Sequence, residues 1–222
     1  MKNIFLASLI AIFYTVAVSA QERLEDIRIT GSSLVNKIKK HDKPEGSPYA
    51  QDKFSKATVA KTNTSALLRY NAFADEFEFI AKGDTLVLDK TEDFSPITIA
   101  ENKYTLLQYT NRKNSLSYGY LLLCHEKGDF ALYKKDNILL SAATTAKTSF
   151  EKDTPARYIN MSKTYYFKNG TAGVSEFPDS KKALSKMFPD KKQAIETYLK
   201  DNKIDFGKES DMAKIVDFLA AN

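Results

Sequence analysis

The stretch YTLLQYTNRKNSLSYGYLLLCHEKGDFALYKK, residues 104–135, decides the fold. Apolar residues recur at every second position around two polar clusters, NRKN at 111–114 and KGD at 127–129. A period of two is typical of half-buried strands, and such polar clusters favour tight turns. The segment YGYLLLC is apolar at successive positions, which predicts a strand in the middle of a sheet with material packed on both faces.

The same alternation extends over residues 57–177 and predicts eleven strands with short connections. Strands that follow one another through such short links pair antiparallel. The expected strands cover residues 57–62, 66–71, 76–81, 85–89, 96–100, 103–110, 117–124, 129–134, 137–142, 163–168 and 172–177.

After Pro178 the apolar period becomes that of helices. Asp179 or Ser180 is suited to cap a short helix, and Asp190 to cap a second one with the stripe Ala194, Ile195, Tyr198 and Leu199. A last helix after Gly207 carries the stripe Met212, Ile215, Val216 and Leu219. The predicted fold class is therefore α+β: an antiparallel β-meander, as a sandwich or a curved sheet, with C-terminal helices packed on it.

The first twenty residues, MKNIFLASLIAIFYTVAVSA, predict a signal peptide that is cleaved after Ala20. The apolar run ends in small residues and is shorter than the roughly 20 residues that a spanning helix needs. Gln21 stands where a bacterial lipoprotein has its cysteine, so no lipid anchor is expected. We expect a secreted or periplasmic protein with no transmembrane segment in the mature chain.

Four parts of the chain are expected: the signal peptide 1–20, an N-terminal arm 21–45, a β-rich body 46–177 and a helical segment 178–222 that packs on the body. The formal charge of the whole chain is +5, and loss of Lys2 with the leader makes it +4. The lysine cluster at residues 37–43 has no glycine-rich or aromatic residues beside it, so it is more typical of a solvated arm than of an anion-binding patch. A secreted destination also argues against nucleic acid as a partner.

The sequence contains few residues that carry chemistry. Cys124 is the sole cysteine, which excludes an intramolecular disulfide. On an extended strand Cys124 and His125 point to opposite faces, so they are not expected to form a thiol–base pair. Two isolated histidines and one cysteine predict no metal site. The G-x-S-x-G, P-loop and dinucleotide-binding patterns do not occur in the sequence, and no cofactor is expected.

The stretch LLRYNAFADEFEF, residues 67–79, admits two interpretations. In the first it is a hairpin whose apolar residues alternate into the core, with Arg69 opposite Glu76 or Glu78 on the outward face. In the second, Arg69, Asn71 and Asp75 converge with Tyr49 to bind a ligand or a partner.

A resemblance arises from several of these segments together. The residues that carry it are Gly46-Ser47-Pro48-Tyr49, Phe54, Leu68-Arg69-Tyr70-Asn71, Asp75-Glu76-Phe77-Glu78 and Phe188-Pro189-Asp190 before a lysine-rich helix. With these the chain resembles uncharacterised secreted proteins of Bacteroidota, over most of its mature length. Ala57 departs from the pattern, which has a glycine after the phenylalanine. The resemblance implies a secreted bacterial protein and no particular mechanism.

The first functional hypothesis is a non-enzymatic protein that binds an unknown protein or envelope component through Tyr49, Arg69, Asn71 and Asp75. The alternative is a carboxylate-dependent glycan hydrolase, because Glu76 and Glu78 share a strand face about 7 Å apart, near the spacing that glycosidases use. A second alternative is a carrier of an apolar ligand, suggested by twelve Tyr and fourteen Phe.

Overall fold

The structure is a computed structural model that describes residues 43–222 except 63, 149 and 171. The predicted signal peptide and the first part of the N-terminal arm, up to residue 42, lie outside the described residues. The chain divides into two compact units. Unit 1 contains the described residues up to Lys103 and the later segment Ile138–Ile159, and unit 2 contains Tyr104–Asn137 and Asn160–Asn222.

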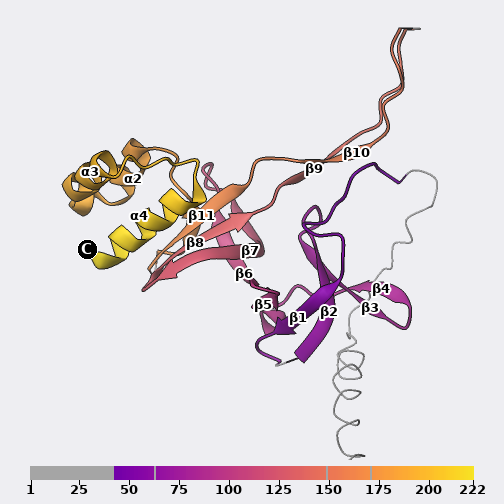
Figure 1. Cartoon of the computed structure of the whole chain (residues 1–222), viewed down its shortest axis with the longest axis horizontal. Helices are drawn as coiled ribbons and strands as arrows, with labels where there is room; N and C mark the ends of the chain where they lie inside the picture. The colour runs from indigo at the N-terminus through magenta and orange to yellow at the C-terminus, as the bar shows by residue number, and fades with distance from the viewer. Residues whose placement is uncertain (1–42, 63, 149, 171) are drawn as a thin grey trace, which may run out of the picture. The chain divides into compact units, whose positions relative to one another are not determined.

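Unit 1 is built on an antiparallel sheet with the strand order β5-β1-β2-β3-β4 (Figure 1). Leu68 and Tyr70 of β2 and Phe77 and Phe79 of β3 are buried in the core as the hairpin interpretation predicts, and Glu78 between the two phenylalanines is buried as well. A short 3₁₀ turn, Glu92–Phe94, precedes the last strand. The strands are β1 (Ser55–Val59), β2 (Thr64–Asn71), β3 (Glu76–Ala81), β4 (Asp84–Val87) and β5 (Ile97–Ile99).

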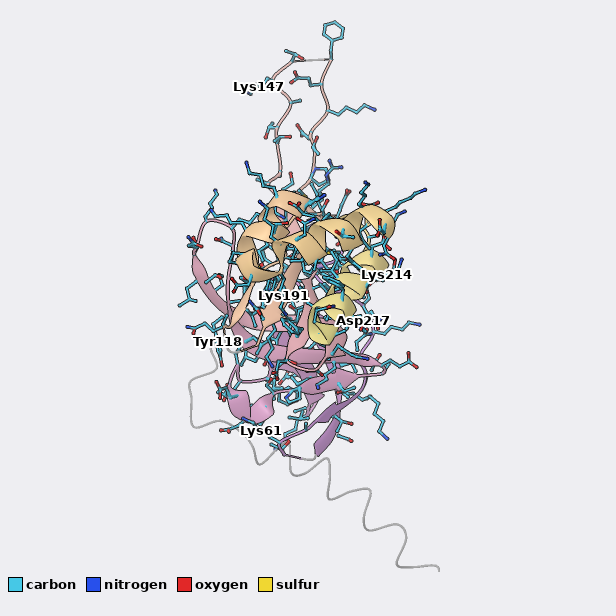
Figure 2. All side chains as sticks on the ribbon, turned by 90° about the vertical axis from the view of Figure 1, so that its left-hand side faces the viewer. Lys61, Tyr118, Lys147, Lys191, Lys214 and Asp217 are labelled. Atoms are coloured by element: carbon cyan, nitrogen blue, oxygen red, sulfur yellow. The ribbon has the colours of Figure 1, made fainter. Side chains whose placement is uncertain are left out.

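A separate two-stranded hairpin also belongs to unit 1. Strands β9 (Ile138–Ser141) and β10 (Arg157–Asn160) pair with each other, and beyond them the chain continues as a narrow arm that carries Lys147 (Figures 1 and 2). We call residues 138–160 the hairpin arm. Its base is joined to the start of unit 1, because the Glu45 amide donates to the Ala156 carbonyl at 2.8 Å and the Tyr158 amide donates to the Glu45 carbonyl at 2.8 Å.

Unit 2 contains a five-stranded sheet that closes on itself. Its order is β6-β7-β8-β11-β12, and β12 also pairs with β6 in parallel through Val174 opposite Tyr109 and Ser175 opposite Thr110. A cluster around Leu121, Ala131 and Tyr166 fills one face of this sheet. The strands are β6 (Asn102–Thr110), β7 (Leu116–Lys127), β8 (Phe130–Lys135), β11 (Thr164–Asn169) and β12 (Val174–Glu176).

On the other face of this sheet α4 (Glu209–Ala221) lies against β7 and β8, and α2 (Lys181–Met187) and α3 (Lys192–Asp201) complete the same apolar cluster (Figure 1). Their apolar residues pack with Leu132 and Phe167, which alternate with the residues of the first cluster along β8 and β11. The predicted stripe of α4 is confirmed, since Met212, Ile215, Val216 and Leu219 are all buried.

The helix starts agree with the sequence in part. Ser180 caps α2, because its side chain accepts a hydrogen bond from the Ala183 amide at 3.3 Å. Asp190 does not cap α3, because it lies inside the 3₁₀ turn Pro189–Lys191 that leads into this helix. In the stripe of α3, Ile195 and Leu199 are buried whereas Ala194 is exposed.

The predicted fold class is confirmed: a strand-rich α+β protein with C-terminal helices. Each of the eleven predicted strands overlaps an observed one, and β10 is the strand that the alternation did not indicate. None of the helices in the described part of the chain has the length and apolar character to cross a membrane.

Candidate functional site

Three of the four predicted binding residues of unit 1 gather around a buried carboxylate. Arg69 and Glu78 face each other across β2 and β3, and Arg69 Nη2 donates to Glu78 Oε2 at 2.6 Å. The same nitrogen donates to the Tyr49 hydroxyl at 2.8 Å, while Asn71 Nδ2 donates to Glu78 Oε1 at 3.0 Å. Glu78 is only 7% exposed, so both of its oxygens depend on these donors. Burial, and then the negative charge of Glu78, raise the pKa of Tyr49.

Aromatic rings enclose the guanidinium of Arg69. Its Cζ lies 3.6 Å from the ring centroid of Tyr49 and 4.3 Å from that of Phe54, and Nη1 donates to the Asp52 carbonyl at 3.1 Å. Cation–π contacts of this kind strengthen as the site loses water. The sequence expectation that Glu78 stands on an outward face is wrong, because the segment from Tyr49 to Phe54 covers that face. We call Tyr49, Arg69, Asn71 and Glu78 the hairpin lock.

Asp75 lies apart from the hairpin lock. Its carboxylate accepts from the Tyr70 hydroxyl at 2.6 Å and from Lys90 Nζ at 2.5 Å. Its backbone has φ of 58°, a conformation that Asp and Asn tolerate better than most residues. Asn71 supports the same turn, since its side-chain oxygen accepts from the Ala74 amide at 3.0 Å. The structure therefore brings together three of the four predicted residues and uses the fourth to shape the turn.

The two carboxylates considered for hydrolysis have different surroundings. Glu78 accepts hydrogen bonds on both oxygens from Arg69 and Asn71, whereas Glu76 is half-buried opposite Asn71 in the strand register. A general acid must donate a proton to the leaving group and must reach it. Glu78, paired with a guanidinium inside the hairpin, is arranged as a structural anion.

A bulge in β7 changes the expected directions of Cys124 and His125. The pairing with β8 shifts register between Leu123 and His125, so the simple alternation on which the sequence argument relied is interrupted here. Cys124 packs against the helical cluster, and His125 Nε2 lies 2.8 Å from Asp217 Oδ1 of α4. Burial raises the pKa of the Cys124 thiol to about 12, which keeps the thiol protonated and unreactive.

The raised pKa values predict a loss of stability at high pH. Burial raises the pKa values of Cys124, Tyr104 and Tyr165 to about 12, from ordinary values of 9.0 for the thiol and 10.0 for the phenols. In this window the unfolded chain releases protons that the folded chain retains, so the free energy of unfolding falls as pH rises. Urea denaturation at pH steps between these values measures the decline. In Cys124→Ala the decline should begin nearer the phenol value, and stability that rises with pH would contradict the assignment.

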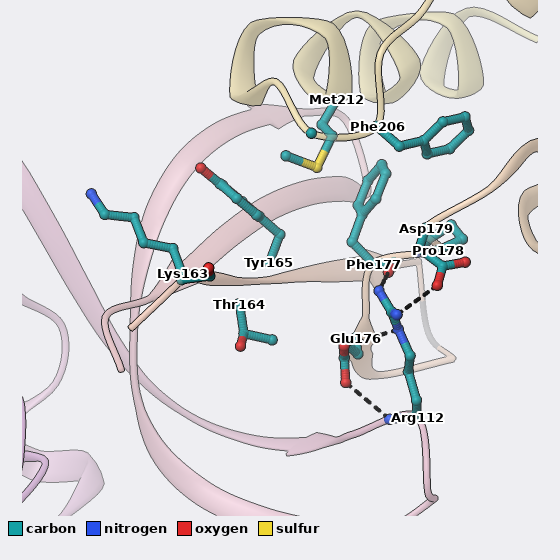
Figure 3. A pocket seen from close by; sticks show the side chains of 12 residues that line it. Arg112, Lys163, Thr164, Tyr165, Glu176, Phe177, Pro178, Asp179, Phe206 and Met212 are labelled. Carbon is teal, nitrogen blue, oxygen red and sulfur yellow. Dashed lines mark hydrogen bonds and ion pairs between the residues drawn. The ribbon is translucent and has the colours of Figure 1, made fainter. Parts of the chain in front are cut away.

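A pocket lies within unit 2 (Figure 3). It has a volume of about 440 Å³. Apolar side chains from β11, the end of β12 and the start of α4 form one side of it, and charged side chains form its rim. Its lining residues are Arg112, Ser162, Lys163, Thr164, Tyr165, Glu176, Phe177, Pro178, Asp179, Phe206, Gly207 and Met212.

The rim of this pocket is held in place by Arg112. Its Nε lies 2.9 Å from Glu176 Oε1, its Nη1 lies 2.6 Å from Asp179 Oδ2, and its backbone amide donates to Glu176 Oε2 at 3.0 Å. Lys163 supplies a second cation and lies 3.6 Å from Asp136. The rim thus presents hydrogen-bond donors and acceptors and charges of both signs. Because these side chains are already held by ion pairs, less side-chain entropy is lost when a ligand binds.

Sequence reasoning did not indicate this pocket. Its residues come from the turn after β6, the start of β11, the end of β12 and the loop before α4. Only the breaks at Pro178 and Gly207 are visible as local signals. Within the described part of the chain, no group of three or more His, Cys, Asp or Glu is placed to hold a metal ion.

Comparisons with known proteins identify no relative of this chain. The chain matches no protein-family model, and neither the curated proteins nor the solved structures give a significant match.

Proposed function

We propose that this chain is a non-enzymatic binding protein that acts outside the cytoplasm and holds a short peptide segment in the pocket of unit 2. The observation that carries the proposal is the pocket itself. Its volume of about 440 Å³ falls within the range of ligand sites, and it combines an apolar side with a few fixed polar groups. The predicted signal peptide supports the extracytoplasmic location.

The chemistry of the lining favours a peptide over a strongly charged ligand. The half-buried Phe206 offers apolar contact to one aliphatic or aromatic side chain, next to the core side chains of Phe177 and Met212, which are only 3% and 2% exposed. The cations of the rim are balanced by carboxylates, because Arg112 is paired with both Glu176 and Asp179. A peptide backbone is neutral and both donates and accepts hydrogen bonds, so it matches a rim of mixed polarity.

The hairpin lock enters this proposal as scaffold. Tyr49, Arg69, Asn71 and Glu78 bond one another, and Asp75 supports the neighbouring turn. Their hydrogen bonds are directed inward, and we assign these residues to the stability of unit 1.

Methionine-methyl NMR of the mature chain tests the proposal. The mature chain has three methionines: Met212 in the pocket, with Met161 and Met187 outside its lining. The probes are acetylated and amidated tripeptides with Leu, Phe or Gly in the centre. We expect saturable shifts of the Met212 methyl signal with the Leu and Phe peptides, little shift with the Gly peptide, and unmoved Met161 and Met187 signals.

A pocket variant makes the experiment specific. Phe206→Ala should weaken binding of the Phe peptide about tenfold, because it removes apolar contact worth about 1.4 kcal/mol. Phe150→Ala, which makes the same chemical change at an exposed position of the hairpin arm, serves as the matched control and should bind within about twofold of the wild type. Equal shifts at all three methionines, or none at millimolar peptide, would overturn the proposal.

A further inference from the structure

A second groove in unit 2 lies between α2 and α3 and is unusually basic. Its volume is about 540 Å³. Glu196 is the one carboxylate among its lining residues, against four lysines. Its lining residues are Lys181, Lys182, Ser185, Lys186, Pro189, Lys192 and Glu196.

The lysines of this groove are placed against ordinary helix electrostatics. Lys182 and Lys186 are four residues apart on α2, where like charges repel. Lys192 lies in the first turn of α3, where the helix dipole disfavours a cation and which contains no acidic residue; Glu196 follows one turn later. None of the ion pairs within the described part of the chain includes any of the four lysines. Their mutual repulsion is a cost that a bound anion would remove.

Ser185 gives an independent indication of a ligand in the same groove. It lines the groove, is only 6% exposed, and its Oγ is buried with no hydrogen-bond partner among the described residues. Buried hydroxyls nearly always have a partner, and each exception calls for an explanation. A hydroxyl group is a donor that an anionic oxygen can accept from. The spacing of α2 places Lys181 one turn above Ser185 and on the same side of the helix.

We infer that this groove binds a phosphate-type oxyanion, with ammonium groups of Lys182, Lys186 and Lys192 around it and Ser185 Oγ as the donor at its base. Lysine ammonium groups act on phosphate as point charges, so several at one place give affinity without a fixed orientation. The anion is either a free phosphate compound or the headgroup of an anionic lipid, and both present the same oxygens. This groove is separate from the peptide pocket, and the two sites share no lining residue.

Binding of two probes to the full mature chain tests the inference. The first probe is inorganic pyrophosphate, followed by calorimetric titration, and the second is vesicles of phosphatidylglycerol compared with vesicles of phosphatidylcholine, followed by co-sedimentation. Pyrophosphate binding without a preference for phosphatidylglycerol identifies a free anion as the ligand. Selective binding to phosphatidylglycerol vesicles without pyrophosphate binding identifies a lipid headgroup.

Variants separate the groove from the general positive charge of the chain. Lys182→Gln with Lys186→Gln should weaken binding of the probe that binds by about tenfold or more, because two charged contacts are lost. The matched control is Lys147→Gln with Lys152→Gln on the hairpin arm, which removes the same charge and should change binding by less than about twofold (Figure 2). Failure of both probes to bind at millimolar concentration, or equal losses in both double variants, would overturn the inference.

Ser185→Ala provides a test that does not depend on charge. The variant should weaken binding about threefold or more, since a hydrogen bond to an anion is lost. It should not lower the melting temperature, because the hydroxyl has no hydrogen-bond partner among the residues that the structure describes. Unchanged binding in Ser185→Ala would remove this residue from the site. A lower melting temperature would show instead that the hydroxyl serves the fold.

Discussion

Arg69→Met is expected to lower the free energy of unfolding by about 3 kcal/mol, because it leaves the Glu78 carboxylate buried without its cation. Glu78 would keep the 3.0 Å hydrogen bond from Asn71 and its contact with the Tyr49 hydroxyl but no cation, and the rings of Tyr49 and Phe54 would lose the guanidinium between them. Urea denaturation followed by circular dichroism measures the change.

The double variant Arg69→Met with Glu78→Leu is the control for this prediction. Removing both charged partners leaves no buried ion, so the double variant should regain more than half of the lost stability. If the free energy of unfolding of Arg69→Met is within about 0.5 kcal/mol of the wild-type value, the hairpin lock contributes little to stability, and Arg69 becomes a candidate for ligand binding again.

Phe167→Ala should have the largest effect on unit 2, at about 4 kcal/mol. The side chain is completely buried, and its ring lies 5.6 Å from that of Phe177, 5.8 Å from that of Phe130 and 6.1 Å from that of Phe188 by centroid distance. Truncation leaves a cavity between the sheet and the helices that these fixed rings cannot collapse to fill. The midpoint of urea denaturation should fall accordingly.

Phe150→Ala is the matched control, because it makes the same chemical change on the hairpin arm. Phe150 is 98% exposed, so its truncation should change the free energy of unfolding by less than about 0.5 kcal/mol. Similar losses in the two variants would mean that Phe150 is buried in solution, against the structure described here.

Much of the fold could be predicted because most of its strands and helices have a recognisable pattern of apolar residues within their own sequence. The continuous apolar run in YGYLLLC indicated a central strand, and β7 indeed lies between β6 and β8 with Gly119–Leu122 buried in succession. β10 was not predicted, because apolar and polar residues do not alternate in its sequence RYIN and because its pairing with β9 spans a long connection. The parallel contact of β12 with β6 has no signal in either strand.

The sites were harder to predict because their determinants lie far apart in the sequence. Arg69 and Glu78 could be paired from the hairpin alone, but the covering segment around Tyr49 and Phe54 was needed to explain why the pair is buried. The bulge at Cys124 likewise depends on how β7 meets β8. The basic groove combines helix spacing, which the sequence shows, with the burial of one hydroxyl group, which it does not.

The interleaved division of the chain has a consequence for its biosynthesis. The backbone of Glu45 pairs with that of Arg157, which the ribosome adds roughly 110 residues later. This part of unit 1 therefore cannot form until about 5 to 20 seconds after Glu45 has been synthesised. Most of the closed sheet of unit 2 is also made before its last strands, β11 and β12, emerge. Neither unit corresponds to a continuous gene segment. A shortened clone that begins at residue 104 would carry the hairpin arm without the backbone that anchors it.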